Sequence, residues 1–188
     1  MELASEPEPF AGAVGRRRER DERARLARAR DGSLADLEAL FREHWPRAHR
    51  AAYLVVHDAA AAEDIAQEAF LAAVRALDRF DLRRPFGPWL HRIVVNRSID
   101  WARSRAIRRE LGEVDRPGVD PPPEGVSSEV VAALASLGPD HRAVVVLRYL
   151  LEYTPGEIAS LLDLPRGTVN SRLRRALDAL GDRLEDGS

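Results

Sequence analysis

The sequence predicts an all-α protein with two small helical domains joined by a proline-rich linker. Ala, Leu, Arg and Val dominate its 188 residues and aromatic residues make up only 6%, a composition that favours helices over sheets. Apolar residues recur at helical spacing on both sides of residues 111–126. That segment holds four prolines and three glycines, and three of the prolines are consecutive, which fits neither a helix nor a central strand.

Composition excludes several classes of protein. With 45% hydrophobic and 32% charged residues, the chain can bury a core and is not disordered throughout. It has no cysteine, which excludes a disulfide scaffold, thiolate zinc sites and cysteine catalysis. No apolar run is long enough to span a membrane, and the amino terminus lacks the pattern of an export signal. We therefore expect a cytoplasmic protein with no membrane insertion.

Residues 1–32 are predicted to form a disordered, arginine-rich tail. Residues 1–15 are rich in Pro, Gly and Glu, and residues 16–30 hold eight arginines against three acids, a local charge of +5. Leu26 is the only large apolar residue of the second stretch, so nothing is expected to hold a helix there against a core. A solvated tail is the favoured interpretation, and contact with nucleic acid is the alternative.

Residues 33–110 are predicted to form the first domain. Ser33 and Asp36 fit a capping box at the start of a helix, and Pro46 is expected to interrupt or kink that helix. A break follows at residues 57–58. The remaining helices are expected over residues 60–80, with a buried stripe of Ile65, Ala69, Ala73 and Leu77, and over residues 89–109, after a loop at residues 81–88.

Charge is distributed unevenly within this domain. Residues 58–78 hold five acids against one arginine, whereas residues 79–109 hold nine arginines against two acids. An acidic helix beside a basic one suits a protein that binds DNA on one side and a basic protein surface on another.

The third helix carries a narrow polar stripe of Arg92, Asn96 and Arg103 next to the loop that contains Phe86. Such a surface can hold a single strand by its phosphates and enclose one unstacked base. Trp89 borders the apolar side and is expected to be a core residue rather than a stacking platform. From the helical angles alone, Asn96 fits a base contact and a plain surface amide equally well.

Residues 111–126 are predicted to be an acidic linker, with one arginine against four acids. Residues 127–185 follow as the second domain. Its first helix contains Val130 to Leu137 and stops at Gly138-Pro139, and a further helix covers residues 140–151.

A helix-turn-helix is predicted at the end of the second domain. Thr154, Pro155 and Glu157 form a strong helix start, and a short turn at Asp163-Leu164 leads into a second helix. Val169, Leu173 and Ala176 fall on the packed side of that helix, and its outer side carries Asn170, Ser171, Arg174 and Arg175. Such groups read base edges or bind phosphates, and a solvated charged face is the alternative.

Three segments together resemble the extracytoplasmic function (ECF) sigma factors of bacterial RNA polymerase. They are DAAAAEDIAQEAFLAAVRALDRF, PFGPWLHRIVVNRSIDWARSR and YTPGEIASLLDLPRGTVNSRLRRAL, and the resemblance covers about residues 33–184. It implies that residues 33–110 are a sigma region 2 bundle and residues 127–185 a region 4 helix-turn-helix. It also implies a sigma factor that directs promoter-specific initiation, needs no cofactor or metal, and is controlled by an anti-sigma factor.

The same resemblance assigns partners to particular residues. Asp64, Gln67 and Glu68 match the surface that binds the clamp helices of the polymerase largest subunit, and region 4 is expected to meet the beta flap. Promoter DNA of the -10 element would meet Phe86, Arg92, Asn96 and Arg103, with Asn96 probing a flipped base. The -35 element would meet Asn170, Ser171, Arg174 and Arg175, with Arg172 as a phosphate or structural partner. Asp163 departs from the family, which often has glycine at that turn position, but Asp tolerates a left-handed backbone.

Two other classes make different predictions. An enzyme would need a catalytic constellation, but the five histidines show no metal spacing and no nucleophile accompanies the acidic residues. We therefore expect no enzymatic activity. An ordinary helix-turn-helix regulator would bind DNA tightly without a partner, as a dimer on a palindrome. A sigma factor would bind weakly alone and select promoters only with the polymerase core.

Overall fold

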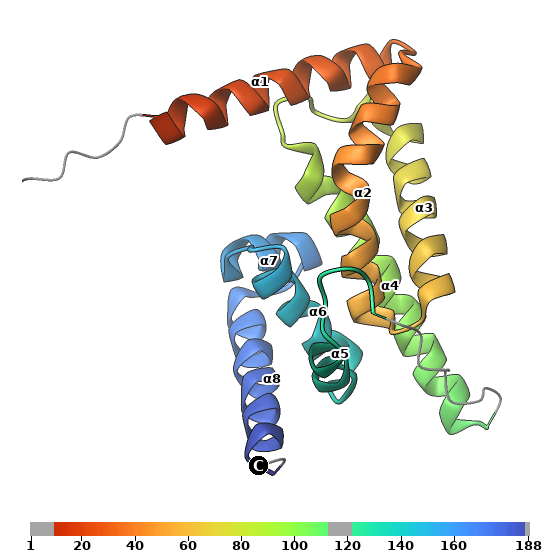
Figure 1. Ribbon diagram of the computed structural model, residues 1–188, viewed down its shortest axis with the longest axis vertical. Coiled ribbons are helices and arrows are strands. Elements are labelled where there is room, and N and C mark those ends of the chain that lie inside the picture. Colours follow the sequence, from red (N-terminus) through yellow and green to blue (C-terminus); the bar gives the residue numbers. More distant parts are fainter. Residues whose placement is uncertain (1–9, 113–121, 187–188) are drawn as a thin grey trace, which may run out of the picture.

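The computed structural model describes residues 10–112 and 122–186, which contain eight α-helices and no strand. Figure 1 shows two groups of helices in contact, with helix α1 extending away from both. The prediction of an all-α protein with two helical domains is confirmed. No helix in the described ranges is long and apolar enough to cross a membrane.

Three helices, α2 (Leu34–Val56), α3 (Ala59–Arg75) and α4 (Phe86–Glu110), pack side by side to form the first domain (Figure 1). The predicted cap is present, because the Ser33 hydroxyl accepts a hydrogen bond from the Asp36 amide at 3.3 Å. The predicted interruption at Pro46 is not found, and one helix runs through it. Pro46 is exposed, and buried residues on both sides of it, such as Leu40 and Ala48, hold α2 together.

Local backbone conformation and capping determine where the helices of this domain end and begin. His57 ends α2 in the left-handed conformation at φ 54°, and the Asp58 side chain then caps α3 by accepting from the Ala61 amide at 3.0 Å. Helix α3 ends at Arg75, earlier than predicted, and a short 3₁₀ turn, η1 (Leu77–Arg79), carries the chain toward α4.

The predicted disorder of the tail is wrong for residues 10–30, which form helix α1 (Phe10–Arg30). Leu26 is only 1% exposed, so the single large apolar residue does anchor this helix to the core. Polar contacts add to it: Arg25 pairs with Glu43 at 2.8 Å and Arg28 with Asp36 at 2.6 Å. These partners lie on α2, beyond a tight turn, and helical periodicity within the tail cannot reveal them. Residues 1–9 of the predicted tail lie outside the described residues.

The second domain contains α5 (Ser128–Ala135), α6 (Pro139–Val145), a π-helical turn η2 (Val146–Leu150), α7 (Pro155–Leu162) and α8 (Arg166–Asp186). Its core includes Leu147, Ile158 and Val169, none of them measurably exposed. The predicted helix over residues 140–151 therefore begins as α6 and ends as the π-helical turn. Residues 113–121, most of the predicted linker, lie outside the described residues.

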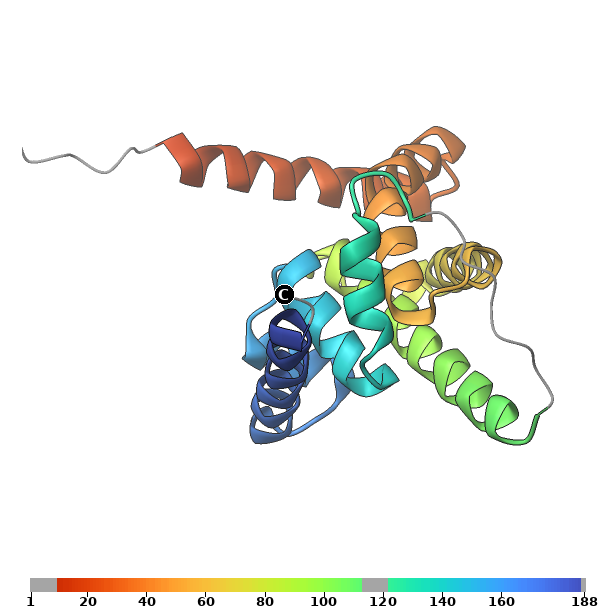
Figure 2. The same ribbon diagram turned by 60° about the horizontal axis from the view of Figure 1, so that its bottom comes forward.

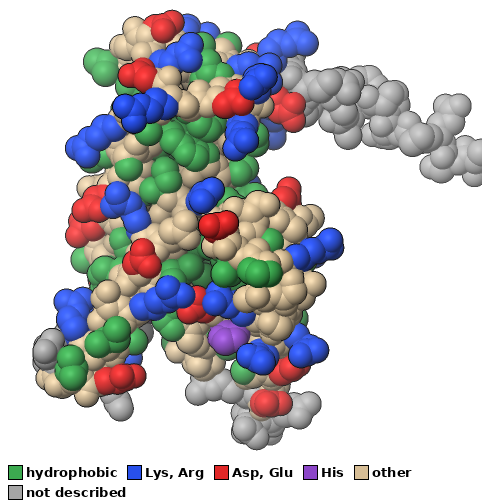
Figure 3. Space-filling view, turned by 180° about the vertical axis from the view of Figure 1, so that it is seen from behind, with side chains coloured by type: hydrophobic (Ala, Val, Ile, Leu, Met, Phe, Trp, Pro, Cys, Tyr) green, Lys and Arg blue, Asp and Glu red, His purple; other side chains and the backbone are tan. Residues whose placement is uncertain are grey.

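The two domains share one hydrophobic core and several polar contacts. Arg142 of α6 is 9% exposed and donates to the Val55 carbonyl of α2 at 2.5 Å. His91 of α4 lies 2.7 Å from the Tyr153 hydroxyl. Figure 2, seen from below, shows α5 and α6 against the first domain, and the rear view in Figure 3 shows acidic and basic side chains close together where the domains join.

Candidate nucleic-acid interface

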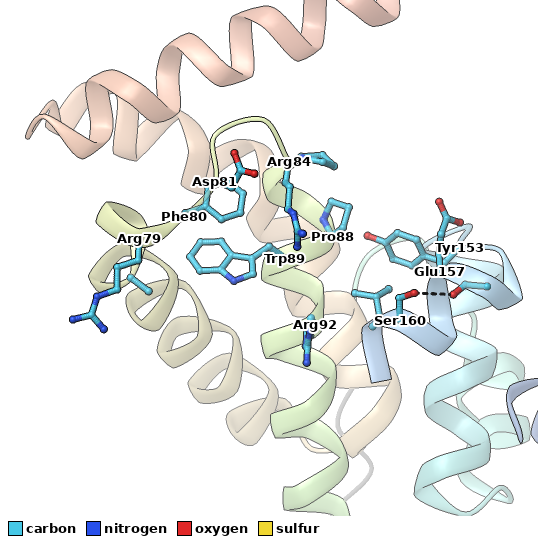
Figure 4. A pocket seen from close by; sticks show the side chains of 14 residues that line it. Arg79, Phe80, Asp81, Arg84, Pro88, Trp89, Arg92, Tyr153, Glu157 and Ser160 are labelled. Carbon is cyan, nitrogen blue, oxygen red and sulfur yellow. Dashed lines mark hydrogen bonds between the residues drawn. The ribbon is translucent and has the colours of Figure 1, made fainter. Parts of the chain in front are cut away.

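The start of α4 borders a cavity of about 790 Å³. Three arginines from the first domain, Arg79, Arg84 and Arg92, line it. In the part of the chain that the structure describes, none of the three has a salt-bridge partner. Figure 4 shows Arg84, from the loop before α4, and Arg92 of α4 one above the other, between Trp89 and the side chains of the second domain. Two carboxylates also line the cavity, but Asp81 is paired with Arg83 and Glu157 accepts from the Thr154 amide. The three unpaired guanidinium groups therefore leave the cavity with an excess of positive charge, which suits a phosphate backbone.

The aromatic residues at this cavity divide into two kinds. Trp89 is half-buried, lines the cavity and stacks on Phe80 with ring centroids 4.4 Å apart (Figure 4). Phe86, in contrast, is 1% exposed and packs edge-on against Phe70 and Phe80. The expectation that Phe86 contacts DNA is therefore corrected: its ring is core, and it holds the start of α4 in place.

Of the polar stripe on α4, Arg92 is exposed and Asn96 is half-buried, one helical turn further along. Arg103 lies at the other end of the stripe and turns toward the second domain. It donates to Asp140 of α6 at 2.6 and 3.2 Å. The structure thus places Arg92 at the cavity, whereas Arg103 is hydrogen-bonded to Asp140, a residue that sequence analysis did not single out.

The far wall of the cavity comes from α7 and the residue before its cap, a contribution that sequence analysis missed. Tyr153, Glu157 and Ser160 line this wall (Figure 4). Burial raises the pKa of the Tyr153 hydroxyl, so Tyr153 stays a neutral hydrogen-bonding group. No pattern within one domain signals such a wall, because it exists only where the two domains meet.

The helix-turn-helix has the expected local geometry. The Thr154 hydroxyl accepts from the Glu157 amide at 3.3 Å, while the Glu157 carboxylate accepts from the Thr154 amide at 2.7 Å. This hydrogen bonding lowers the pKa of Glu157, which therefore stays charged at the positive end of α7. Asp163 adopts the left-handed conformation at φ 54°, so the turn forms without glycine.

Helix α8 presents most of its polar side to solvent. Val169, Leu173 and Ala176 are buried, as predicted, while Asn170, Arg174 and Arg175 are exposed. Ser171 is half-buried and its hydroxyl donates to the Thr168 carbonyl at 2.9 Å. Arg172 is half-buried and pairs with Asp140 of α6 at 3.0 Å, within the second domain.

The acidic surface on α3 is exposed as expected. Asp64, Gln67 and Glu68 are all exposed, and the Gln67 amide donates to Glu63 at 3.0 Å. Arg97 of α4 pairs with Glu68 and links this surface to the basic helix. The described residues contain no group of three or more His, Asp and Glu side chains that can hold a metal ion.

Comparisons with known proteins decide the family. The family models described as Sigma-70 region 2 and Sigma-70, region 4 match residues 40–107 and 127–180. The ECF RNA polymerase sigma factor SigW of Bacillus subtilis is 31% identical over 171 residues, which cover 82% of this chain and 90% of SigW. SigL of Mycobacterium tuberculosis is 35% identical over 167 residues, which cover 84% of this chain and 93% of SigL. The chain belongs to the ECF sigma factors.

Solved structures agree with this assignment. CnrH, solved in complex with the cytosolic domain of CnrY, matches the sigma factor with a TM-score of 0.68 and 30% identity over 89% of this chain and 99% of CnrH. RpoE of Bartonella quintana, solved with the anti-sigma factor NepR, has a TM-score of 0.66 and 21% identity over 81% and 98% of the two chains, and shares the fold. The protein is therefore a transcription initiation factor, as the sequence resemblance implied.

Proposed function

We propose that this sigma factor opens the -10 element with α4, reads the -35 element with α8 and binds the polymerase core with α3. The observation that carries the proposal is the pair of exposed polar surfaces on separate domains. One consists of exposed Arg92 at the cavity with half-buried Asn96 one helical turn further along α4, and the other of exposed Asn170, Arg174 and Arg175 on α8. We further propose that the protein acts in the cytoplasm and catalyses no reaction itself.

At the -10 element, unpaired Arg79, Arg84 and Arg92 would hold the phosphates of one strand along the cavity. Asn96 would offer its amide to the edge of a flipped base, since an amide both donates and accepts. Flipping a base costs a few kcal/mol of stacking and pairing energy, and the phosphate contacts would offset this cost. Arg103 would join this surface once released from Asp140.

At the -35 element, α8 would enter the major groove. Asn170 and Arg174 would contact base edges, and Arg175 a base edge or a phosphate. Ser171 would face the sugar-phosphate backbone of the DNA. Arg172 is half-buried and pairs with Asp140, which supports a role in orienting the helix rather than in reading sequence. The buried row of Val169, Leu173 and Ala176 would keep α8 rigid against its domain during this contact.

The acidic surface of α3 would dock on the clamp helices of the polymerase largest subunit, and region 4 would meet the beta flap. Exposed Asp64, Gln67 and Glu68 support this, because three neighbouring side chains there present acceptor oxygens without apolar cover. Control by an anti-sigma factor is also proposed. RpoE, which shares the fold, was solved with the anti-sigma factor NepR.

Reconstituted transcription tests these assignments. Asn96→Ala should leave closed-complex affinity within about twofold and lower the yield of open complex, measured by permanganate reactivity of unpaired thymines, by tenfold or more.

Arg175→Ala should weaken binding to a -35 fragment by roughly five- to 150-fold, the equivalent of about 1–3 kcal/mol, without changing association with the core. Arg42→Ala, at an exposed site on α2, is the control.

Two results would overturn the proposal. The first is promoter selection by the purified chain alone that equals selection with the polymerase core, which would indicate an independent helix-turn-helix regulator. The second is unchanged open-complex yield with Asn96→Ala together with unchanged -35 affinity with Arg175→Ala.

A further inference from the structure

Helix α1 is fixed to the first domain along its carboxyl-terminal half. Leu26 and Ala29 are buried, and Arg25 and Arg28 pair with acids of α2. Glu22 lies 3.2 Å from His44, also on α2. The direction of α1 is therefore set by the fold, and its arginines are held in place relative to the rest of the first domain.

One face of this helix is basic and has no partner among the described residues. Arg20, Arg23 and Arg30 are exposed and, unlike Arg25 and Arg28, make no hydrogen bond or ion pair with any described residue. On an ideal helix they fall within an arc of about 80°, with Glu19 at its edge. We call Arg20, Arg23 and Arg30 the α1 basic face.

This face continues toward the cavity beside α4. Arg23 lines a hollow together with Glu19 and Glu22 of α1 and with Arg83 and Arg84 of the loop before α4. Glu22 lies against His44 and Arg83 is paired with Asp81, whereas Arg23 and Arg84 have no ion-pair partner among the described residues. Arg84 in turn lines the larger cavity with Arg92. Guanidinium groups therefore follow one another from α4 through the loop to α1, and Figure 1 shows α1 running on past that loop, away from both domains.

We propose that the α1 basic face binds the phosphates of promoter DNA that continues beyond the -10 element. This rests on the proposed function, because the -10 surface beside α4 fixes where the DNA lies. Duplex DNA carries one charge per roughly 1.7 Å of axis. Arg20 and Arg23 lie about one turn apart on α1 and Arg30 about two turns further, so each can meet a different phosphate. The alternative occupant, an acidic protein surface, is disfavoured because protein interfaces centre on aromatic or large apolar residues, and none lies between Arg20 and Arg30 on this face.

The test compares two variants that lose the same charge. Arg20→Gln with Arg23→Gln removes two members of the α1 basic face while keeping residues that favour a helix. Arg18→Gln with Arg42→Gln is the control, because Arg18 lies on the opposite side of α1 and Arg42 on α2, both exposed. Each variant is bound to polymerase core, and the affinity of the holoenzyme for a promoter fragment is measured from 50 to 200 mM salt.

We expect the slope of log affinity against log salt to be shallower by about 2 in the first variant and unchanged in the control. The ratio of the promoter affinity of the unmodified holoenzyme to that of the first variant should then fall about tenfold between 50 and 200 mM salt. An equal slope in the first variant and the unmodified protein would overturn the proposal. So would a loss of affinity for the core without a change in slope, which would identify a protein surface as the occupant.

Failure of the underlying function gives a different result. If the unmodified protein and the control do not direct the core to the promoter, the proposed function is wrong and the slopes carry no meaning for α1. If both do so and only the slope comparison fails, the inference on α1 is wrong by itself. A thermal melt of each variant checks that the fold is unchanged.

Discussion

Arg103 of α4 donates two hydrogen bonds to Asp140 of α6, at 2.6 and 3.2 Å, and so joins the two domains. Arg172 of α8 approaches the same carboxylate at 3.0 Å. The proposed -10 surface and the proposed -35 helix are thereby connected through one acidic side chain. Under the proposed function these two surfaces bind separate promoter elements, so the Arg103–Asp140 contact between the domains would have to open for both to be used.

Replacing Asp140 with Asn should weaken this junction, because neither arginine keeps its charged partner. A partly exposed pair of this kind contributes about 1 kcal/mol, so the population with separated domains should rise about fivefold. The chain has no cysteine, so spin labels on Ala60→Cys and Ala179→Cys, both at exposed sites, report the distance between the domains. Asp100→Asn, an exposed acid on α4, is the control. Identical distance distributions in the Asp140→Asn variant and the unmodified protein would show that the carboxylate does not hold the domains together.

Arg142 makes the second junction, and it is buried. Burial lowers the pKa of its guanidinium to about 10, so the group is still charged at neutral pH. It donates to three carbonyls of its own domain, at Leu134, Ala135 and Leu137, as well as to Val55. Arg142→Met keeps the apolar stem but leaves these carbonyls without a donor, and should lower the free energy of unfolding by about 3 kcal/mol. Urea denaturation measures this, and Arg42→Met at an exposed site should change it by less than about 0.5 kcal/mol.

Two buried histidines predict how stability depends on pH. Burial, with the charge of Arg142, lowers the pKa of His57 to about 4, and burial, with the charges of His44 and Arg47, lowers that of His91 to about 4. Both stay neutral in the folded chain, whereas the unfolded chain takes up protons near pH 6.5. Stability should therefore be fully present above pH 6.5 and fall as pH drops toward 4, by up to about 3 kcal/mol for each histidine.

The His91→Gln variant isolates one of these two groups. Glutamine keeps a hydrogen-bonding partner for Tyr153 but does not titrate, so the variant should lose about half of the pH dependence between 6.5 and 4. Urea denaturation at pH 7, 6, 5 and 4.5 measures the change. A variant as sensitive to acid as the unmodified protein would mean that His91 takes up its proton without disturbing the fold.

Features with local causes were predictable from the sequence. The Thr154–Glu157 capping box and the left-handed turn at Asp163 depend on residues next to one another in the chain, and the structure confirms both. The buried row on α8 follows from helical periodicity in the same way. Family, fold class and the polar side of α8 were accordingly accessible without a structure.

Features made by distant segments were not predictable. The expectation for Phe86 failed because its neighbours, Phe70 and Phe80, come from α3 and the segment after it. Packing between the domains depends on Arg142 and on the Val55 carbonyl, which is 87 residues away in the sequence, and an arginine in an apolar run gives no sign of that acceptor. The order of α1 was missed for the same reason, since one leucine is a weak signal until its partner helix is known.

Replacing Leu26 tests whether this buried side chain holds α1 against the first domain. At 1% exposure it fills a closed site between α1 and the first domain, so Leu26→Ala should remove about 2–4 kcal/mol of local stability. Hydrogen exchange of the α1 amides should accelerate by one to three orders of magnitude, while that of α8 stays unchanged, because only α1 loses its contact. Leu34→Ala is a matched control at a position 79% exposed, just beyond the turn at Gly32. Equal exchange in both variants would mean that the ion pairs to Glu43 and Asp36, rather than the buried leucine, fix the direction of α1.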